Sequence, residues 1–191
     1  MTVSEQGRAQ HAHRVHLPDL HALTPGRVVE STSARYVWAL ARLSLGWVFL
    51  WAFLDKTFGL GHETKHAQAW IHGGSPTKAF LKFGAKGPFK GFYHDIAGAA
   101  WADWLFMIGL AAIGVALILG VCIRIAAVAG AVLLVMMWSV VLPPANNPFM
   151  DDHLIYAILL IGLAFVSAGD AVGLGRWWGS TPLVRKLPVL K

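Results

Sequence analysis

The chain has 191 residues, of which 56% are hydrophobic and only 14% are charged, and its formal net charge is +6. Soluble domains carry about 25% charged residues, so this composition excludes an ordinary water-soluble domain and favours lipid as the solvent. The length leaves room for one bundle of spanning helices and no second domain. The excess positive charge lies in the tails and in one loop, which favours contact with lipid headgroups over binding of nucleic acid.

Residues 1–34 are polar, rich in histidine and interrupted by Pro18 and Pro25. They lack the apolar core of a signal peptide, so we predict a disordered tail on the cytoplasmic side of the membrane. Residues 35–178 form the predicted membrane domain, and residues 179–191 form a short basic C-terminal tail.

Four long apolar runs follow the first tail, and three of them contain no charged residue or histidine: Leu105 to Ile123, Ile125 to Met150, and Leu154 to Gly169. A helix rises about 1.5 Å per residue, so roughly 20 residues cross a hydrocarbon layer of ~30 Å. The sequence therefore predicts an all-α integral membrane protein, a bundle of four spanning helices at 36–56, 101–122, 124–142 and 152–169.

Arg42 is the only charged residue in the first apolar run, Tyr36 to Leu54. It lies about two turns inside the helix end, from where a long side chain can reach the headgroups, so it does not exclude the span. Asp170, at the inner end of the fourth predicted span, is an available partner. We interpret Arg42 as a structural charge.

The distribution of lysine and arginine predicts the orientation. The long loop 57–100 carries five lysines, but long loops weigh little in the positive-inside rule. The connection 143–152 carries no basic residue and ends in two aspartates. The opposite side carries Arg124, Arg176, Arg185, Lys186 and Lys191. We therefore predict a plasma membrane protein with both termini in the cytoplasm.

The long first loop contains a helix signal of its own. Ser75-Pro76 is a typical helix start, and Ala79, Phe80 and Phe83 supply an apolar side. Lysines follow at intervals of four, at Lys78, Lys82, Lys86 and Lys90. This pattern predicts an interfacial amphipathic helix on the outer leaflet that ends at Gly84 or at Gly87-Pro88. The alternative is a solvated loop in which the lysine spacing is chance.

Several redox groups are disfavoured by the sequence. Cys122 is the only cysteine, which excludes a C-x-x-C dithiol and a cysteine-bound iron–sulfur cluster. No histidine lies deep in a span, so a haem within the bundle is not expected, and no Gly-rich loop of the dinucleotide or phosphate type is present. We predict no haem, flavin, iron–sulfur cluster or metal in the chain.

Polar residues gather at the predicted outer helix ends, where a bundle brings them together. Carboxylate, lysine and histidine side chains at a membrane mouth could protonate a quinone carbonyl or hold a small anion. We predict catalytic roles for Lys56, Asp152 and His153, and substrate-binding roles for Asp55, Asp103, Asn147, Lys82 and Lys86. The alternative is that Asp103 and Asp151 cap helix N-termini while Lys56 only reaches for headgroups.

The motifs on these segments resemble those of a known family. The first span, from Arg42-Leu-Ser-Leu-Gly46-Trp-Val-Phe49 to Asp55-Lys56-Thr-Phe-Gly59, resembles the opening motif of the DoxX/DoxD family of four-helix membrane proteins. Its DoxD-like branch is similar at Gly73-Gly74-Ser75-Pro76-Thr77, Phe80-Leu81, Lys86-Gly87-Pro88-Phe89, Asn147-Pro148 and Asp152-His153-Leu-Ile-Tyr156-Ala157. The resemblance covers roughly residues 35–178.

The resemblance implies a subunit of a thiosulfate:quinone oxidoreductase, which oxidises thiosulfate to tetrathionate and reduces membrane quinone with the help of a second, smaller subunit. One alternative is a non-catalytic membrane scaffold or anchor for a soluble redox partner. A small-solute transporter component is less favoured, because the span centres lack the charges and broken helices that transporters use. The implied partners are membrane lipid and a redox subunit, and the sequence leaves homo-oligomerisation open.

Overall fold

The computed structural model describes residues 31–191, and this part of the chain is helical without a strand. The bundle consists of α1 (Thr32–Phe58), α3 (Ala100–Leu119), α4 (Ile123–Val140) and α5 (Asp152–Phe165). Most of the predicted disordered tail lies outside the described residues. Its last residues, 32–34, belong to α1, so the first helix begins earlier than predicted.

Three helices, α1, α3 and α4, are long and apolar enough to cross a membrane. This confirms the prediction of a helical membrane protein. The helix α5 has 14 residues, which at 1.5 Å per residue amounts to about 21 Å and falls short of the hydrocarbon layer. It ends early because Ser167 adopts a left-handed backbone with φ 50°. The fourth span therefore stays a prediction.

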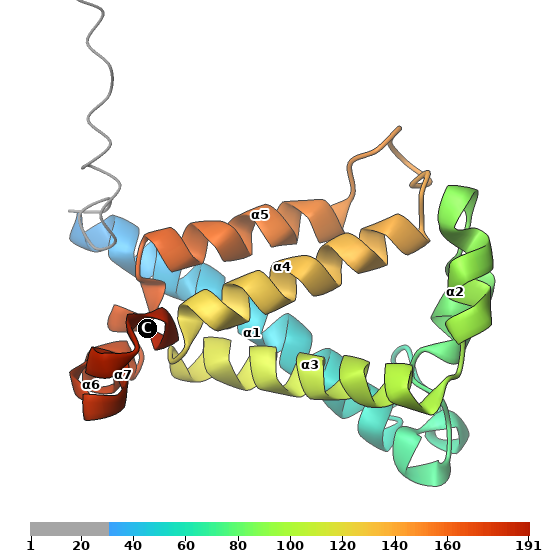
Figure 1. The fold of residues 1–191 in the computed structure, drawn as a ribbon, viewed down its shortest axis with the longest axis horizontal. Helices are drawn as coiled ribbons and strands as arrows, with labels where there is room; N and C mark the ends of the chain where they lie inside the picture. The colour runs from blue at the N-terminus through green and yellow to red at the C-terminus, as the bar shows by residue number, and fades with distance from the viewer. Residues whose placement is uncertain (1–30) are drawn as a thin grey trace, which may run out of the picture.

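The four helices form two antiparallel pairs, α1 with α3 and α4 with α5, which α3 and α4 join (Figure 1). Glycines permit close approach: a Cβ on Gly114 would lie 2.8 Å from the backbone nitrogen of Leu50, and one on Gly130 would lie 2.6 Å from Leu160. The buried core of the bundle consists mainly of Leu45, Phe49, Met107, Leu110, Ile113, Leu117, Leu134, Leu160 and Leu163.

The two ends of the bundle differ (Figure 1). We call the end that carries the α1–α3 loop and the α4–α5 connection the loop end. We call the opposite end, where α1 begins and the C-terminal segment lies, the terminal end. The two helix pairs diverge toward the loop end, and this divergence decides which polar residues can meet there.

The α1–α3 loop has more structure than one amphipathic helix. A π-helical turn, Phe80–Gly84, ends at one of the two predicted glycines, and a separate helix, α2 (Lys90–Ile96), follows it. The chain between them is extended at Ala85, so the four spaced lysines do not share one helix. Leu81, Ala85, Tyr93 and Val140 form a small buried cluster that holds the loop against α4. The interfacial location of this loop stays a prediction.

The C-terminal residues are folded, although the sequence suggested only a short basic tail. They form α6 (Gly175–Ser180), α7 (Pro182–Lys186) and a 3₁₀ turn, Pro188–Leu190. Thr181 caps α7 by accepting a hydrogen bond from the backbone of Val184, and Pro182 occupies the first turn. These short elements lie against the terminal end of the bundle (Figure 1).

Candidate functional site

Asp55, near the end of α1, organises the first part of the loop. Its buried carboxylate accepts hydrogen bonds from the backbone N–H groups of His62, Glu63 and Thr64, at 3.3, 3.1 and 2.9 Å. Both carboxylate oxygens are used in these bonds. These bonds turn the chain back over the end of α1, and the substrate-binding role of Asp55 stays a prediction.

Asp103, on α3, also holds part of the α1–α3 loop through its carboxylate. One oxygen of its buried carboxylate accepts hydrogen bonds from Ser75 Oγ at 2.9 Å, from Thr77 N at 3.1 Å and from Thr77 Oγ1 at 2.5 Å. The alternative in which Asp103 caps its own helix is wrong, because α3 has no side-chain cap, and the substrate-binding role stays a prediction. Asp103 ties the loop segment 75–77 to the first turn of α3.

We predict that Asp103→Ala loosens this loop without unfolding the bundle. The change leaves the buried Thr77 N–H and hydroxyl without their acceptor, which costs on the order of 1–3 kcal/mol. Limited proteolysis or hydrogen exchange of residues 62–84 should accelerate. Asp95→Ala is the matched control, because Asp95 is an exposed aspartate on the same loop. Equal protection in both variants would show that Asp103 does not hold the loop.

Between the two aspartate anchors the loop lines an open cavity of about 580 Å³ at the loop end. Three of its lining residues are lysines, Lys56 from α1 and Lys78 and Lys82 from the loop, and one is an acid, Glu63. The remaining lining residues are Thr64, Ala67, Gln68, His72, Gly73, Gly74, Ser75, Pro76, Ala79, Phe80 and Phe83. We call this space the basic cavity.

Lys56 is the most enclosed cation of the basic cavity. Its side chain is 15% exposed, and its Nζ lies 2.8 Å from a carboxylate oxygen of Glu63, whose own side chain is 79% exposed. A salt bridge with so exposed a partner is weak and can open at little cost. Lys56 can therefore exchange Glu63 for an incoming anion, and the cavity keeps a net positive charge.

Not all predicted cationic residues reach the cavity. Lys82 lines it, as does Lys78, which the sequence placed only in the lysine series. Lys86 is exposed but does not line it, and its backbone N–H donates to the carbonyl of Val140 at 3.0 Å. The substrate-binding prediction therefore fits Lys82 and does not fit Lys86.

Asp152 and His153 lie at the start of α5, across the loop end from the end of α1 (Figure 1). Neither residue lines the basic cavity. The predicted convergence of Lys56 with these two residues is therefore not found, because the helix pairs diverge toward this end.

The start of α5 carries a polar group of its own. Asp151 caps the helix by accepting from the N–H of Leu154 at 3.2 Å, as the capping alternative predicted. His153 Nδ1 lies 2.7 Å from Asp151 and 3.5 Å from Asp152. The ligand atoms of Asp151, Asp152 and His153 lie within 4.8 Å of one another, a spacing that a cation could use and that the sequence pattern did not indicate.

Asn147 is a turn residue in the α4–α5 connection. Its Oδ1 accepts from the backbone N–H groups of Phe149 at 3.2 Å and Met150 at 3.0 Å. Asparagine commonly stabilises a turn in this way. The substrate-binding role of Asn147 stays a prediction.

Arg42 is fully buried and binds carbonyl oxygens rather than a carboxylate. It donates to Leu117 and Ile118 at the end of α3 and to Ala171 and Val172 beyond α5. The last carbonyls of a helix lack partners within the helix and carry the negative end of its dipole, so they suit a cation. These contacts support the structural role that we predicted.

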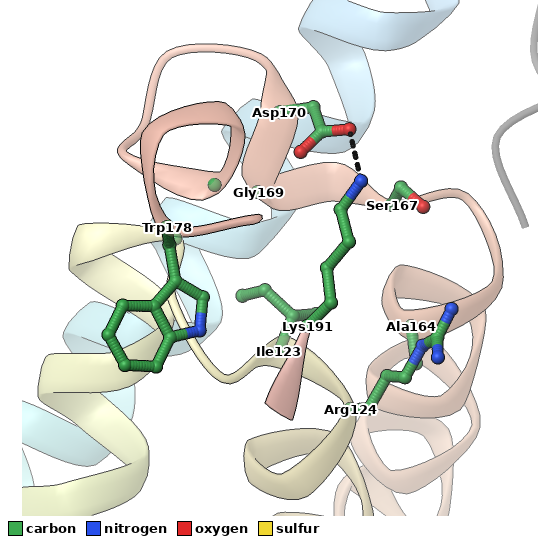
Figure 2. A pocket seen from close by; sticks show the side chains of 10 residues that line it. Ile123, Arg124, Ala164, Ser167, Gly169, Asp170, Trp178 and Lys191 are labelled. Atoms are coloured by element: carbon green, nitrogen blue, oxygen red, sulfur yellow. Dashed lines mark hydrogen bonds and ion pairs between the residues drawn. The ribbon is translucent and has the colours of Figure 1, made fainter. Parts of the chain in front are cut away.

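The expected partner of Arg42, Asp170, is engaged elsewhere. It lies 3.3 Å from the Nζ of Lys191, and this pair borders a second cavity at the terminal end (Figure 2). That cavity measures about 10 Å³, room for one water molecule at most. This cavity is therefore too small for a substrate.

Sequence patterns alone missed several residues of the basic cavity. His72, Gln68 and Glu63 reach it only because the loop turns at the two buried aspartates, and no periodic pattern shows this path. Lys78 was visible as a member of the lysine series, and its position four residues before Lys82 was a usable signal.

The fold and site define a class: a helical membrane protein with a basic cavity at one mouth of its bundle and a cavity of about 10 Å³ at the other. Residues 37–143 match the DoxX family, and the chain belongs to that family. No curated protein and no solved structure matches the chain. The family match includes the whole basic cavity and ends before Asn147 and Asp152.

Proposed function

We propose that the chain is the membrane subunit of a quinone-linked oxidoreductase that takes electrons from thiosulfate, as the DoxD-like motifs imply. The observation that carries the proposal is the basic cavity of a DoxX family member, in which Lys56, Lys78 and Lys82 face one exposed acid. Positive side chains in a partly enclosed space concentrate small anions and strengthen charge-assisted hydrogen bonds to them.

The oxidation of thiosulfate is favoured by positive charge around the reacting anions. Two thiosulfate dianions join through a new S–S bond to give tetrathionate and release two electrons, and a quinone takes up those electrons with two protons to become quinol. Two dianions repel each other, so positive charge around them lowers the barrier to their meeting. The cavity volume of about 580 Å³ falls in the range of roughly 300–1,000 Å³ typical of small-molecule sites.

Phe80 and Phe83 line the same cavity, and Phe83 is 80% exposed. We place the quinone headgroup at this apolar border, which a lipid-soluble molecule can approach from the bilayer. His153 and its carboxylate neighbours lie on the other side of the loop end, so they serve at most as a separate proton-donating group. This revises the set of three catalytic residues predicted from the sequence.

A membrane anchor for a soluble redox partner is the second candidate. Cys122 is the only cysteine, and the sequence carries no redox centre. In that case electrons would not pass through this chain, and the cavity would bind an acidic segment of the partner.

One experiment separates the two candidates. The purified full chain is extracted with organic solvent to detect bound quinone, and it is then assayed for thiosulfate-dependent reduction of a soluble quinone, with and without added second subunit. We expect co-purified quinone and thiosulfate-dependent turnover. A chain that contains no quinone and gives no turnover in either assay would favour the anchor.

The orientation is part of the proposal: both termini in the cytoplasm, with the loop end outside the plasma membrane. In a Cys122→Ser background, Asn146→Cys should react with an impermeant maleimide in intact cells, and Ser180→Cys should react only after lysis. Both positions are exposed in the structure, so access depends on the side of the membrane. The reverse labelling pattern would place the basic cavity in the cytoplasm.

A further inference from the structure

The C-terminal segment 171–191 combines exposed apolar and basic side chains at the terminal end of the bundle. The segment contains no aspartate or glutamate. Its exposed large apolar residues are Val172, Leu174, Trp177, Leu183, Leu187 and Val189, and its exposed basic residues are Arg176, Arg185 and Lys186. We call residues 171–191 the terminal platform.

The start and middle of the platform are fixed to the bundle and to each other by hydrogen bonds. Leu174 N donates to the carbonyl of Leu119 at 2.8 Å, close to the end of α3. Trp178 Nε1 donates to the carbonyl of Leu190 at 2.7 Å and so ties α6 to the last turn.

The last turn is also held to the bundle. Arg124 at the start of α4 donates to the carbonyl of Pro188 at 3.1 Å, and Lys191 pairs with Asp170 at 3.3 Å. Figure 2 shows Lys191 reaching Asp170, with Arg124 and Trp178 on either side. The platform is therefore a folded surface rather than a loose tail.

Three basic side chains of the platform take no part in these contacts with the bundle. Arg176, Arg185 and Lys186 have no acidic partner among residues 31–191. Leu183 in α7 and Leu187, the residue that follows the helix, are both exposed, while Val184 between them is buried. An apolar side next to basic residues is the pattern of a segment that lies in a membrane interface.

We propose that the terminal platform binds the phosphate groups of anionic phospholipids. Arg176, Arg185 and Lys186 pair with the phosphates, while Trp177 and Leu183 enter the boundary between headgroups and acyl chains. The platform lies next to helices that are long and apolar enough to cross the bilayer, so the lipid headgroups are within its reach. A soluble acidic protein would satisfy the cations but would leave the exposed tryptophan and leucines without an apolar partner.

The test uses the full chain in lipid nanodiscs. In a Cys122→Ser background, Leu183→Cys carries a fluorescent probe, and a nitroxide quencher is attached either to phosphatidylglycerol or to phosphatidylcholine at equal mole fraction. We expect the phosphatidylglycerol quencher to be severalfold more effective, and rising ionic strength to remove the difference. Asn146→Cys is the control probe, because it is exposed at the loop end, away from the platform.

Removing the charges should remove the preference. The severalfold preference for anionic lipid depends on the three basic residues together, because each basic residue near an anionic membrane surface is attracted to it. Arg176→Gln, Arg185→Gln and Lys186→Gln should reduce it stepwise. Equal quenching by both lipids in the unsubstituted platform would overturn the proposal. Quenching by aqueous iodide alone would also overturn it and would point to a surface for a soluble protein.

Discussion

Arg42→Gln will sharply lower the folded yield and thermal stability of the chain. Arg42 is completely buried and connects α1 to the end of α3 and to the segment after α5 through four carbonyl oxygens. Glutamine is shorter and has one N–H₂ group, so it leaves most of these acceptors without a donor. Hydrogen bonds from a charged group contribute about 1.5–3 kcal/mol each, so the total loss exceeds roughly 3 kcal/mol.

Arg35→Gln is the matched control for Arg42→Gln. Arg35 lies on the same helix, seven positions earlier, and is exposed. The chemical change is the same, and we expect almost no change in the melting temperature. Arg42→Lys should be intermediate, because it keeps the charge but cannot reach both groups of carbonyls. If Arg42→Gln were as stable as Arg35→Gln and lost only activity, Arg42 would belong to a functional site instead.

The helical membrane class could be predicted from the sequence because it depends on run length and composition alone. Apolar runs without charges predicted α3 and α4 to within a few residues of their ends. The ends themselves depend on single backbone conformations: Gly120 with φ 76° ends α3, and Ser167 with φ 50° ends α5 early. Hydropathy does not show such positions, which is why the fourth predicted span extends beyond the helix.

The candidate site was predicted only in part, for a geometric reason. The prediction from the sequence assumed four closely packed, parallel helix axes. In such a bundle all polar residues at one membrane side would lie in a single cluster. The divergence of the two helix pairs separates the end of α1, which carries Lys56, from the start of α5, which carries His153 (Figure 1). The loop contacts of the buried aspartates were not foreseen, because a carboxylate that binds backbone N–H groups of a loop has no sequence pattern that distinguishes it from a substrate ligand.

Lys56→Ala will have the largest effect on ligand binding, measured as the affinity of the purified chain for thiosulfate in nanodiscs at low salt. Lys56 is the most enclosed of the three cavity lysines, so its charge is the least screened. Loss of one charge-assisted hydrogen bond should weaken binding by roughly tenfold or more, which corresponds to about 1.4 kcal/mol or above. Lys86→Ala is the control, since Lys86 belongs to the same loop but does not line the cavity.

The Glu63→Gln variant distinguishes an anion-binding cavity from a purely structural salt bridge, because only the former predicts opposite changes in thiosulfate affinity for the Lys56 and Glu63 variants. If the Lys56–Glu63 pair only supported the fold, Lys56→Ala and Glu63→Gln would have the same small destabilising effect. If the cavity binds an anion, the effects on affinity are opposite: Glu63→Gln removes a competing carboxylate and strengthens thiosulfate binding severalfold, while Lys56→Ala weakens it. His153→Ala should leave this affinity unchanged, because His153 does not line the cavity. Equal affinity in the Lys56, Glu63 and Lys86 variants would remove the basic cavity from the proposed function.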